Sequence, residues 1–348
     1  MKLHESKFGK LPDGREAKLF TLENDNNITV KLTNYGGIIT AIEMPDQHGK
    51  KENIACGFDK PENYLQEDYI AAYPYFGAVI GRFGNRIARG HLEIEGETYR
   101  LAKNNGPNHL HGGDTGFDKR LWDAKMIENK DEAGIELTYK SPDMEENYPG
   151  NLDVKCIYTL NNKNELGIQY YAETDKTTVV NMTNHTYFNL TGGKNDILHH
   201  ELKLNADKMT VMMDQIPNGN IIPVEGTVHD FKEFKKFIQG MSELPTGYDH
   251  NYVLDNEKGE MKHAGTLREK ESGRQVEVYT TQPGIQLYTG YWIPEVQVDD
   301  EKKFGRYAGV ALETQHYPDS VHHEDFPSTK LKPGEKYDQR TIYKLVTE

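Results

Sequence analysis

Apolar and polar residues alternate along most of this chain, and this period of two constrains its fold more than any other feature. Ile28, Val30 and Leu32, for example, alternate with polar residues, as in a strand whose side chains point to opposite faces. Gly36 and Gly37 separate this run from a second one, which predicts a hairpin. Runs of the same kind recur to the end of the chain, at 91–101, 134–140, 152–160, 165–174, 201–213, 264–270, 274–290 and 307–317.

Helical periodicity is scarce by comparison. A helix is predicted over residues 230–240, where Phe231, Phe234 and Phe237 recur at helical spacing and Gly240 suits a C-cap.

A second segment, residues 60–69, is expected to hold one or two helical turns. The chain contains no internal repeat and no linker-like tract. We therefore predict an all-β fold, a large antiparallel β-sandwich with few short helices, in which residues 1–348 form one domain.

Composition and charge exclude several classes of function. The net charge of −14 and the absence of a basic stripe argue against nucleic acid as a partner. The N-terminus lacks the apolar core of a signal peptide, and no stretch approaches the length of a membrane helix. With only Cys56 and Cys156, a disulfide framework is not expected. We expect free thiols and a cytoplasmic protein that binds no membrane.

The segment VVNMTNHTYFNLTGG, residues 179–193, starts like a buried strand and then fills with amides and hydroxyls around His185. Its even-numbered positions are largely apolar, and we expect them to pack on a second sheet. Its odd-numbered positions are polar but uncharged: Asn181, Thr183, His185, Tyr187 and Asn189. A concave ligand-binding surface and a wet outer strand with an incidental histidine fit this pattern equally well.

Glu313 follows three apolar residues in VALETQ. At a partly buried strand end, desolvation would raise the pKa of this carboxyl group towards that of a useful general base. The commoner case is a surface glutamate just past the core.

His109 and His111 are two residues apart, so an extended chain would point both rings the same way. This spacing alone is weak evidence for a metal, because no nearby carboxylate or cysteine completes a ligand set. We expect neither a metal nor a cofactor.

Six motifs occur in the same order over most of the chain, and together they are more specific than any one of them. They are GRFGNRIARG, NHLHGG with GFDKRLW, NHTYFNLTGG, GYDHNYVL, TTQPGIQLYTG, and LETQHYPDS with FPSTKLKPGEKY. In these motifs the chain resembles the aldose 1-epimerases, or galactose mutarotases. The resemblance implies a supersandwich fold and cofactor-free interconversion of the α and β anomers of free aldohexoses such as galactose and glucose.

The resemblance also implies roles for particular residues. Glu313 matches the general base, which takes the proton of the C1 hydroxyl, and His185 matches the general acid, which protonates the ring oxygen. We expect the two to face each other across a space about the size of a pyranose ring. Residues that match substrate-binding positions are Asn85, Arg86, His111, Tyr187, Asp249 and Gln286.

Other functions fit parts of the same pattern. A hexose-6-phosphate 1-epimerase would draw on the arginine cluster of Arg82, Arg86 and Arg89. A non-catalytic sugar-binding protein could share the fold, but it would need no acid–base pair. A glycoside hydrolase would normally use two carboxylates. The only partner expected is a monosaccharide, bound by a monomer or weak homodimer.

Overall fold

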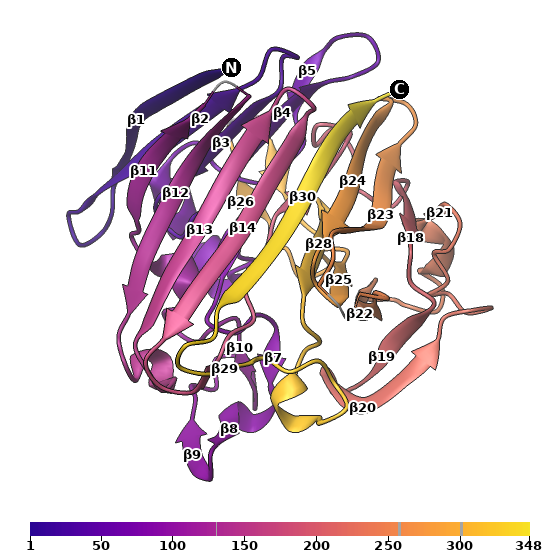
Figure 1. Ribbon diagram of the computed structural model, residues 1–348. Coiled ribbons are helices and arrows are strands. Elements are labelled where there is room, and N and C mark those ends of the chain that lie inside the picture. The colour runs from indigo at the N-terminus through magenta and orange to yellow at the C-terminus, as the bar shows by residue number, and fades with distance from the viewer. Residues whose placement is uncertain (130, 257–258, 300–301) are drawn as a thin grey trace.

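The structure is a computed structural model that describes residues 1–129, 131–256, 259–299 and 302–348 (Figure 1). Among these residues the largest sheet is antiparallel and has nine strands. In spatial order they are β11 (Asp123–Glu128), β12 (Glu132–Ser141), β13 (Leu152–Asn161), β14 (Glu165–Thr174), β30 (Tyr337–Thr347), β24 (Arg274–Thr280), β23 (Lys262–Glu269), β18 (Glu201–Leu204) and β21 (Lys235–Lys236).

Two further sheets pack behind this one. A five-stranded sheet consists of β1 (Lys2–Lys10), β2 (Glu16–Glu23), β3 (Thr29–Thr33), β4 (Ile39–Pro45) and β5 (Lys51–Asn53). A six-stranded sheet runs in the order β17 (Tyr187–Phe188), β28 (Val310–Gln315), β25 (Gly284–Tyr288), β22 (Asp249–Val253), β19 (Lys208–Met213) and β20 (Ile216–Pro223). Figure 1 shows β28, β25 and β22 behind the front layer.

Short strand pairs and helical turns fill the connections. The pairs are β6 (Val79–Ile80) with β16 (Thr183–Asn184), β7 (Arg86–Ile87) with β10 (His109–Leu110), β8 (His91–Ile94) with β9 (Glu97–Arg100), β15 (Thr178–Val179) with β29 (Lys330–Leu331), and β26 (Val296–Gln297) with β27 (Lys303–Phe304). The helices are α1 (Glu67–Ala72) and the 3₁₀ turns η1 (Pro61–Leu65), η2 (Ala88–Gly90), η3 (Phe117–Lys119), η4 (Glu145–Asn147), η5 (Phe237–Gly240) and η6 (Ser320–His322).

One hydrophobic core joins all three large sheets. It contains Val30 from the five-stranded sheet, Tyr158 and Val278 from the nine-stranded sheet, and Ile285 and Leu312 from the six-stranded sheet. Strands such as β3, with Val30 and Leu32, and β24, with Val276 and Val278, contribute every second residue, as the period of two predicts. The all-β prediction is therefore confirmed, including the hairpin that joins β3 to β4.

The helix predicted over residues 230–240 is wrong, whereas η1 and α1 confirm the turns predicted at 60–69. Only η5 is helical within 230–240, because Lys235 and Lys236 pair with β18 and add an edge strand to the large sheet. Phe231 reaches the core from the chain before β21, and Phe237 reaches it from the first position of η5. Phe234 is only partly buried, so the helical spacing of the three phenylalanines does not mark one buried helix face.

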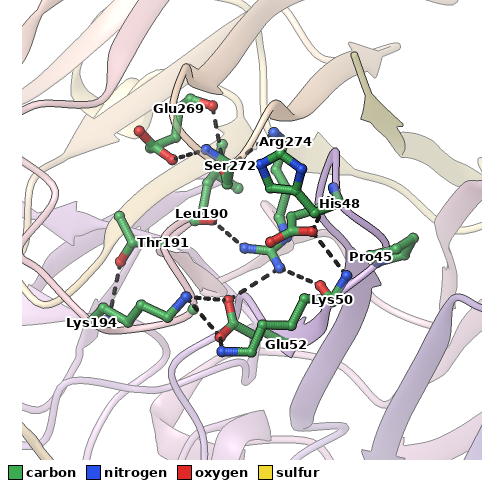
Figure 2. A network of polar contacts seen from close by, with 12 residues as sticks. Pro45, His48, Lys50, Glu52, Leu190, Thr191, Lys194, Glu269, Ser272 and Arg274 are labelled. Atoms are coloured by element: carbon green, nitrogen blue, oxygen red, sulfur yellow. Dashed lines mark hydrogen bonds and ion pairs between the residues drawn. The ribbon is translucent and has the colours of Figure 1, made fainter.

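An ion pair between Arg274 and Glu52 connects two of the sheets (Figure 2). Arg274 on β24 has a fully buried side chain and donates to the carbonyl oxygens of Leu190 and Lys50, at 2.9 Å each. It also lies 3.2 Å from Glu52 on β5, which pairs with Lys50 and Lys194 as well. One guanidinium therefore links the nine-stranded sheet, the five-stranded sheet and the chain that follows β17.

Replacing Arg274 with methionine is expected to lower the free energy of unfolding by about 3 kcal/mol, because it leaves buried acceptors without a donor. Urea denaturation measures this loss. The matched control is Lys2→Met, which breaks an exposed ion pair with Glu23 and should cost less than about 1 kcal/mol. Equal losses in the two variants would contradict the role given to Arg274.

Two further expectations bear on this fold. Cys56 and Cys156 are buried free thiols, as predicted. No helix in the described part of the chain is long and apolar enough to span a membrane.

Candidate active site

A row of polar residues crosses the six-stranded sheet on the face turned away from the main core. Asn251 on β22 lies opposite Gln286 on β25, and Gln286 lies opposite Glu313 on β28. All three side chains are almost fully buried. Leu287 and Leu312, which alternate with them, point into the main core. The period of two thus delivers polar groups to one face and apolar groups to the other.

His185 extends this row beyond Glu313. Tyr187 on β17 pairs with Ala311 on β28, and the same register continued by two residues places His185 beside Glu313. The two side chains lie with His185 Nε2 3.6 Å from Glu313 Oε1. His185 is 3% exposed and Glu313 is 2% exposed, so neither is the surface residue that the sequence alone allowed.

The expected gap of a pyranose ring between these two residues is wrong, because 3.6 Å leaves no room for a ring. The physical reason lies in the hemiacetal itself. Its hydroxyl oxygen and its ring oxygen are bonded to the same carbon, so an acid and a base that serve both oxygens must lie close together.

The segment 179–193 is not one strand, although it is buried from Val179 to Leu190. It contributes to three short elements, β15, β16 and β17, that pair with different partners. The amides of Asn181, Asn184 and Asn189 bond to backbone groups of neighbouring loops. The prediction that its odd-numbered amides line a cleft is therefore wrong for Asn181 and Asn189. They hold the loops that surround His185.

Burial governs the protonation of the catalytic candidates. It lowers the pKa of His185 to about 4, so the imidazole is neutral near pH 7. Burial, reinforced by the negative charge of Asp249 and opposed by Arg86, raises the pKa of Glu313 well above its ordinary value. Both shifts disfavour charge at this site. A carboxyl group beside a neutral imidazole and a carboxylate beside an imidazolium carry the same net charge and differ only in the position of one proton. The pair is thus arranged for moving a single proton.

His111 is a second imidazole at this site, with its ring 5.3 Å from that of His185. The backbone N–H of Asn85 donates to His111 Nδ1 at 3.1 Å. A neutral imidazole that accepts at Nδ1 carries its proton on Nε2. Burial lowers the pKa of His111 well below its usual value, which keeps it in this neutral form. His111 is therefore a hydrogen-bond donor at the site.

His109 does not share this site. The φ angle of His111 is +51°, so the segment is not extended and the two rings do not point the same way. His109 instead bonds to the carbonyl of Ala102 at 2.8 Å and the hydroxyl of Tyr148 at 2.6 Å.

The side chains of His111, His185 and Glu313 offer one ligand atom each, all within 4.8 Å of one another. Two imidazoles and a carboxylate are a donor set that divalent metals use. However, a metal-bound histidine usually donates from its other nitrogen, whereas His111 accepts there from Asn85. The tautomer that results places a proton on the nitrogen left for the metal. This set therefore fits a metal poorly.

Four predicted sugar-binding residues surround the pair. Gln286 Nε2 donates to Asp249 Oδ1 at 2.6 Å, which fixes both side chains on one face of the sheet. Arg86 donates from Nε to Asn105 at 3.0 Å, and its charge acts on both Glu313 and His111. The side-chain oxygen of Asn85 accepts the backbone N–H of Arg86 at 2.9 Å, which orients the amide.

Aromatic rings lie against the two histidines of the site. The ring of Tyr187 lies 4.8 Å from that of His185 and 5.9 Å from that of Tyr288. Tyr75 lies 4.6 Å from His111 on another side. Flat ring faces of this kind suit the C–H groups of a sugar.

The proposed arginine cluster is not assembled. Arg82 is buried, and its guanidinium donates to the hydroxyl and carbonyl oxygens of Ser141 and to the carbonyl oxygens of Pro142 and Pro149. Arg89 is exposed, in a turn with a φ angle of +58°. Arg86 is left as the single arginine of the three whose charge acts on Glu313.

Three residues of this site were not assigned from the sequence. The sequence gives no reason to choose Tyr75 as a site residue, because the other aromatic residues of AAYPYFG fit that role equally well. Asn251 and Gln315 did carry one, since each lies two residues beyond an assigned residue, Asp249 or Glu313, and therefore shares its face of the sheet.

A buried carboxyl–imidazole pair among amides and aromatic rings is an arrangement that suits acid–base chemistry on a small polar molecule. Comparison with known proteins gives the family. The model of the aldose 1-epimerase family matches residues 18–344. This chain belongs to that family, and it is an isomerase.

The similarity extends over whole chains. Galactose mutarotase of Bos taurus is 42% identical over 343 residues, which are 97% of each chain. Aldose 1-epimerase of Escherichia coli (strain K12) is 34% identical over 345 residues, with the same coverage. The crystal structure of galactose 1-epimerase from Lactobacillus acidophilus superimposes with a TM-score of 0.85 at 29% identity, covering 99% of both chains.

Proposed function

We propose that this enzyme interconverts the α and β anomers of free aldohexoses such as galactose and glucose, with Glu313 as general base and His185 as general acid. The observation that carries the proposal is the 3.6 Å separation of His185 Nε2 and Glu313 Oε1 in a buried site. It brings together two proton-transfer groups from segments more than a hundred residues apart. The names of the galactose mutarotases and aldose 1-epimerases similar to this chain support the same reaction.

The reaction needs one proton to leave the sugar and one to join it. In the reactive form the proton shared by the pair lies on His185. The Glu313 carboxylate takes the proton of the C1 hydroxyl, the bond between C1 and the ring oxygen breaks, and the His185 imidazolium protonates the ring oxygen. The electrons of the broken bond stay on that oxygen, and C1 becomes an aldehyde carbon. Rotation about the C1–C2 bond turns its other face to the hydroxyl.

Ring closure reverses these transfers. The hydroxyl oxygen attacks C1, His185 takes back its proton, and Glu313 returns a proton to the aldehyde oxygen, as microscopic reversibility requires. The enzyme ends with the protons it started with, so the cycle consumes no cofactor. His111, Asn85, Arg86, Asp249, Gln286 and Tyr187 hold the sugar in this proposal, through hydrogen bonds and ring contact.

The alternatives have weaker support. A hexose-6-phosphate epimerase would need cations for the phosphate, and Arg82 is committed to backbone and serine oxygens. A non-catalytic sugar-binding protein would not need a carboxyl group and an imidazole paired in a buried site.

Polarimetry on freshly dissolved sugars tests the substrate class. We expect the protein to accelerate mutarotation of α-D-galactose and α-D-glucose, and to act more slowly on glucose 6-phosphate, because Arg86 is the one member of the proposed arginine cluster whose charge acts on Glu313. An aldopentose in the same series reports how much the C6 hydroxymethyl group contributes. No acceleration with any free sugar would defeat the proposal, and a preference for the phosphate would favour the alternative.

We also propose that residues 1–348 form one domain, since a single core contains residues of all three large sheets. The cytoplasmic location and the monomeric or weakly dimeric state remain predictions from the sequence.

A further inference from the structure

Two buried amides beside the catalytic pair have no hydrogen-bond partner among the described residues. Asn251 and Gln315 are both 0% exposed, and neither their oxygen nor their nitrogen atoms are paired. A buried polar group left without a partner costs about 1–3 kcal/mol. Such exceptions call for a physical explanation, most often bound water or a role in the site.

Other buried amides in this protein are paired. Asn181, Asn184 and Asn256 bond to backbone groups, and Gln282 bonds to His316 and Tyr337. The fold therefore satisfies buried amides elsewhere. The two unpaired amides, Asn251 and Gln315, both lie next to the site.

The position of the two amides follows from the strand register. Gln315 is two residues beyond Glu313 on β28, on the same face, and lies opposite Gly284 on β25. A Cβ atom at Gly284 would lie 2.8 Å from Asn251 Oδ1. The side chain of Asn251 thus occupies the space that the missing side chain leaves, on the same face as Gln315.

Two side-chain oxygen atoms of the site, next to these amides, are unpaired as well. Oε2 of Glu313 and Oε1 of Gln286 have no partner among the described residues. Oε1 of Glu313 lies 3.6 Å from His185, which is beyond hydrogen-bond length. The described residues therefore supply no hydrogen bond that fixes how the Glu313 carboxyl group is turned. A general base requires such fixing, because small misplacements slow proton transfer.

We propose that Asn251 and Gln315 are positioning residues, which hold the Glu313 carboxyl group in one orientation through ordered water molecules. The inference rests on the proposed function for its catalytic meaning. Water is the partner that fits, because it both donates and accepts and is small enough for a buried polar space. The amides act on the sugar only through Glu313.

A high-resolution crystal structure of the sugar-free protein tests the hydration directly. We expect a water molecule within hydrogen-bond distance of both the Gln315 amide and Glu313 Oε2, and a second polar contact from this water network to Asn251. A direct bond between Gln315 and Glu313, or no water between them, would overturn the proposal. This measurement does not depend on activity, so it stands apart from the test of the proposed function.

Kinetics of Gln315→Met and Asn251→Leu test the consequence. Each is expected to lower kcat for galactose by about 10-fold or more, with KM little changed, since the variant loses alignment of the base and no contact to the sugar. The matched control is Gln282→Met, which removes an equally buried but fully paired glutamine. It should lower stability and leave kcat unchanged while folded.

The outcomes separate the possible roles. A raised KM with normal kcat would mean that the amides contact the sugar directly, and unchanged kinetics would mean that they do not act at all. Either result overturns the positioning role. Should a variant fail to fold, the crystal structure of the wild-type protein still decides. A wild-type protein that does not accelerate mutarotation defeats the proposed function instead.

Discussion

Glu313→Gln is expected to lower kcat for anomer interconversion by about 10²–10⁴-fold, the usual contribution of a positioned general base. Glutamine keeps the size and the hydrogen-bonding shape of the side chain but cannot take a proton from the C1 hydroxyl. Because the sugar keeps its other contacts, KM should change little. Initial rates by polarimetry, over a range of galactose concentrations, measure both constants.

The control for this variant is Glu43→Gln, on β4, where the carboxylate pairs with Lys31 and Lys51 outside the site. Its kcat should match the wild-type value. Near-normal kcat in Glu313→Gln would remove Glu313 from the chemistry, whatever the geometry of the pair.

His185→Asn should also lower kcat by about 10²–10⁴-fold, for the complementary reason that the ring oxygen loses its proton donor. Asparagine fills part of the same space and donates a hydrogen bond, but it does not transfer a proton. The ring of His111 lies 5.3 Å from that of His185. If His111 donates the proton in place of His185, the fall in kcat will be smaller. A further fall in kcat when His111→Asn is added would reveal that replacement.

His263→Asn serves as the control, since His263 lies on β23 and bonds to Asn205 and Thr266. It should keep wild-type kinetics. If His185→Asn instead raised KM and left kcat unchanged, His185 would be a binding group and the acid would have to be another residue.

Much of the fold could be predicted from the sequence, because alternation reports directly which face of a strand is buried. On β28, Val310 and Leu312 enter the core while Glu313 and Gln315 share the opposite face. The same rule placed His185 on a polar face. Alternation did not reveal that the two residues meet, since pairing between β17 and β28 depends on the whole sheet. The family resemblance supplied that partner.

The failures have physical causes. The phenylalanines of residues 230–240 have helical spacing, but Lys235 and Lys236 pair with β18 at the edge of the large sheet, and this long-range contact is not visible in the local sequence. The amides of residues 179–193 were indistinguishable from ligand-binding groups in the sequence. Their backbone partners lie on loops from distant parts of the chain, such as Gly77 and Gly84.

The roles of the histidines could not be predicted from local sequence either. His109 and His111 form a regular pair in the sequence, yet a left-handed φ angle at His111 turns them to different surroundings. His200 accepts the backbone N–H of Leu190, and His322 pairs with Asp319. Both are structural. A histidine's role here follows from what its two nitrogens bind, which local sequence does not specify.

The central claim is that Glu313 and His185 together move the protons that open and close the sugar ring. Exchange between the α and β anomer signals of galactose at equilibrium, followed by NMR, measures that reaction without a change in bulk composition. We predict fast exchange with the wild-type protein, and exchange no faster than the spontaneous rate with the folded double variant Glu313→Gln, His185→Asn. Exchange at the wild-type rate in the double variant would contradict the account.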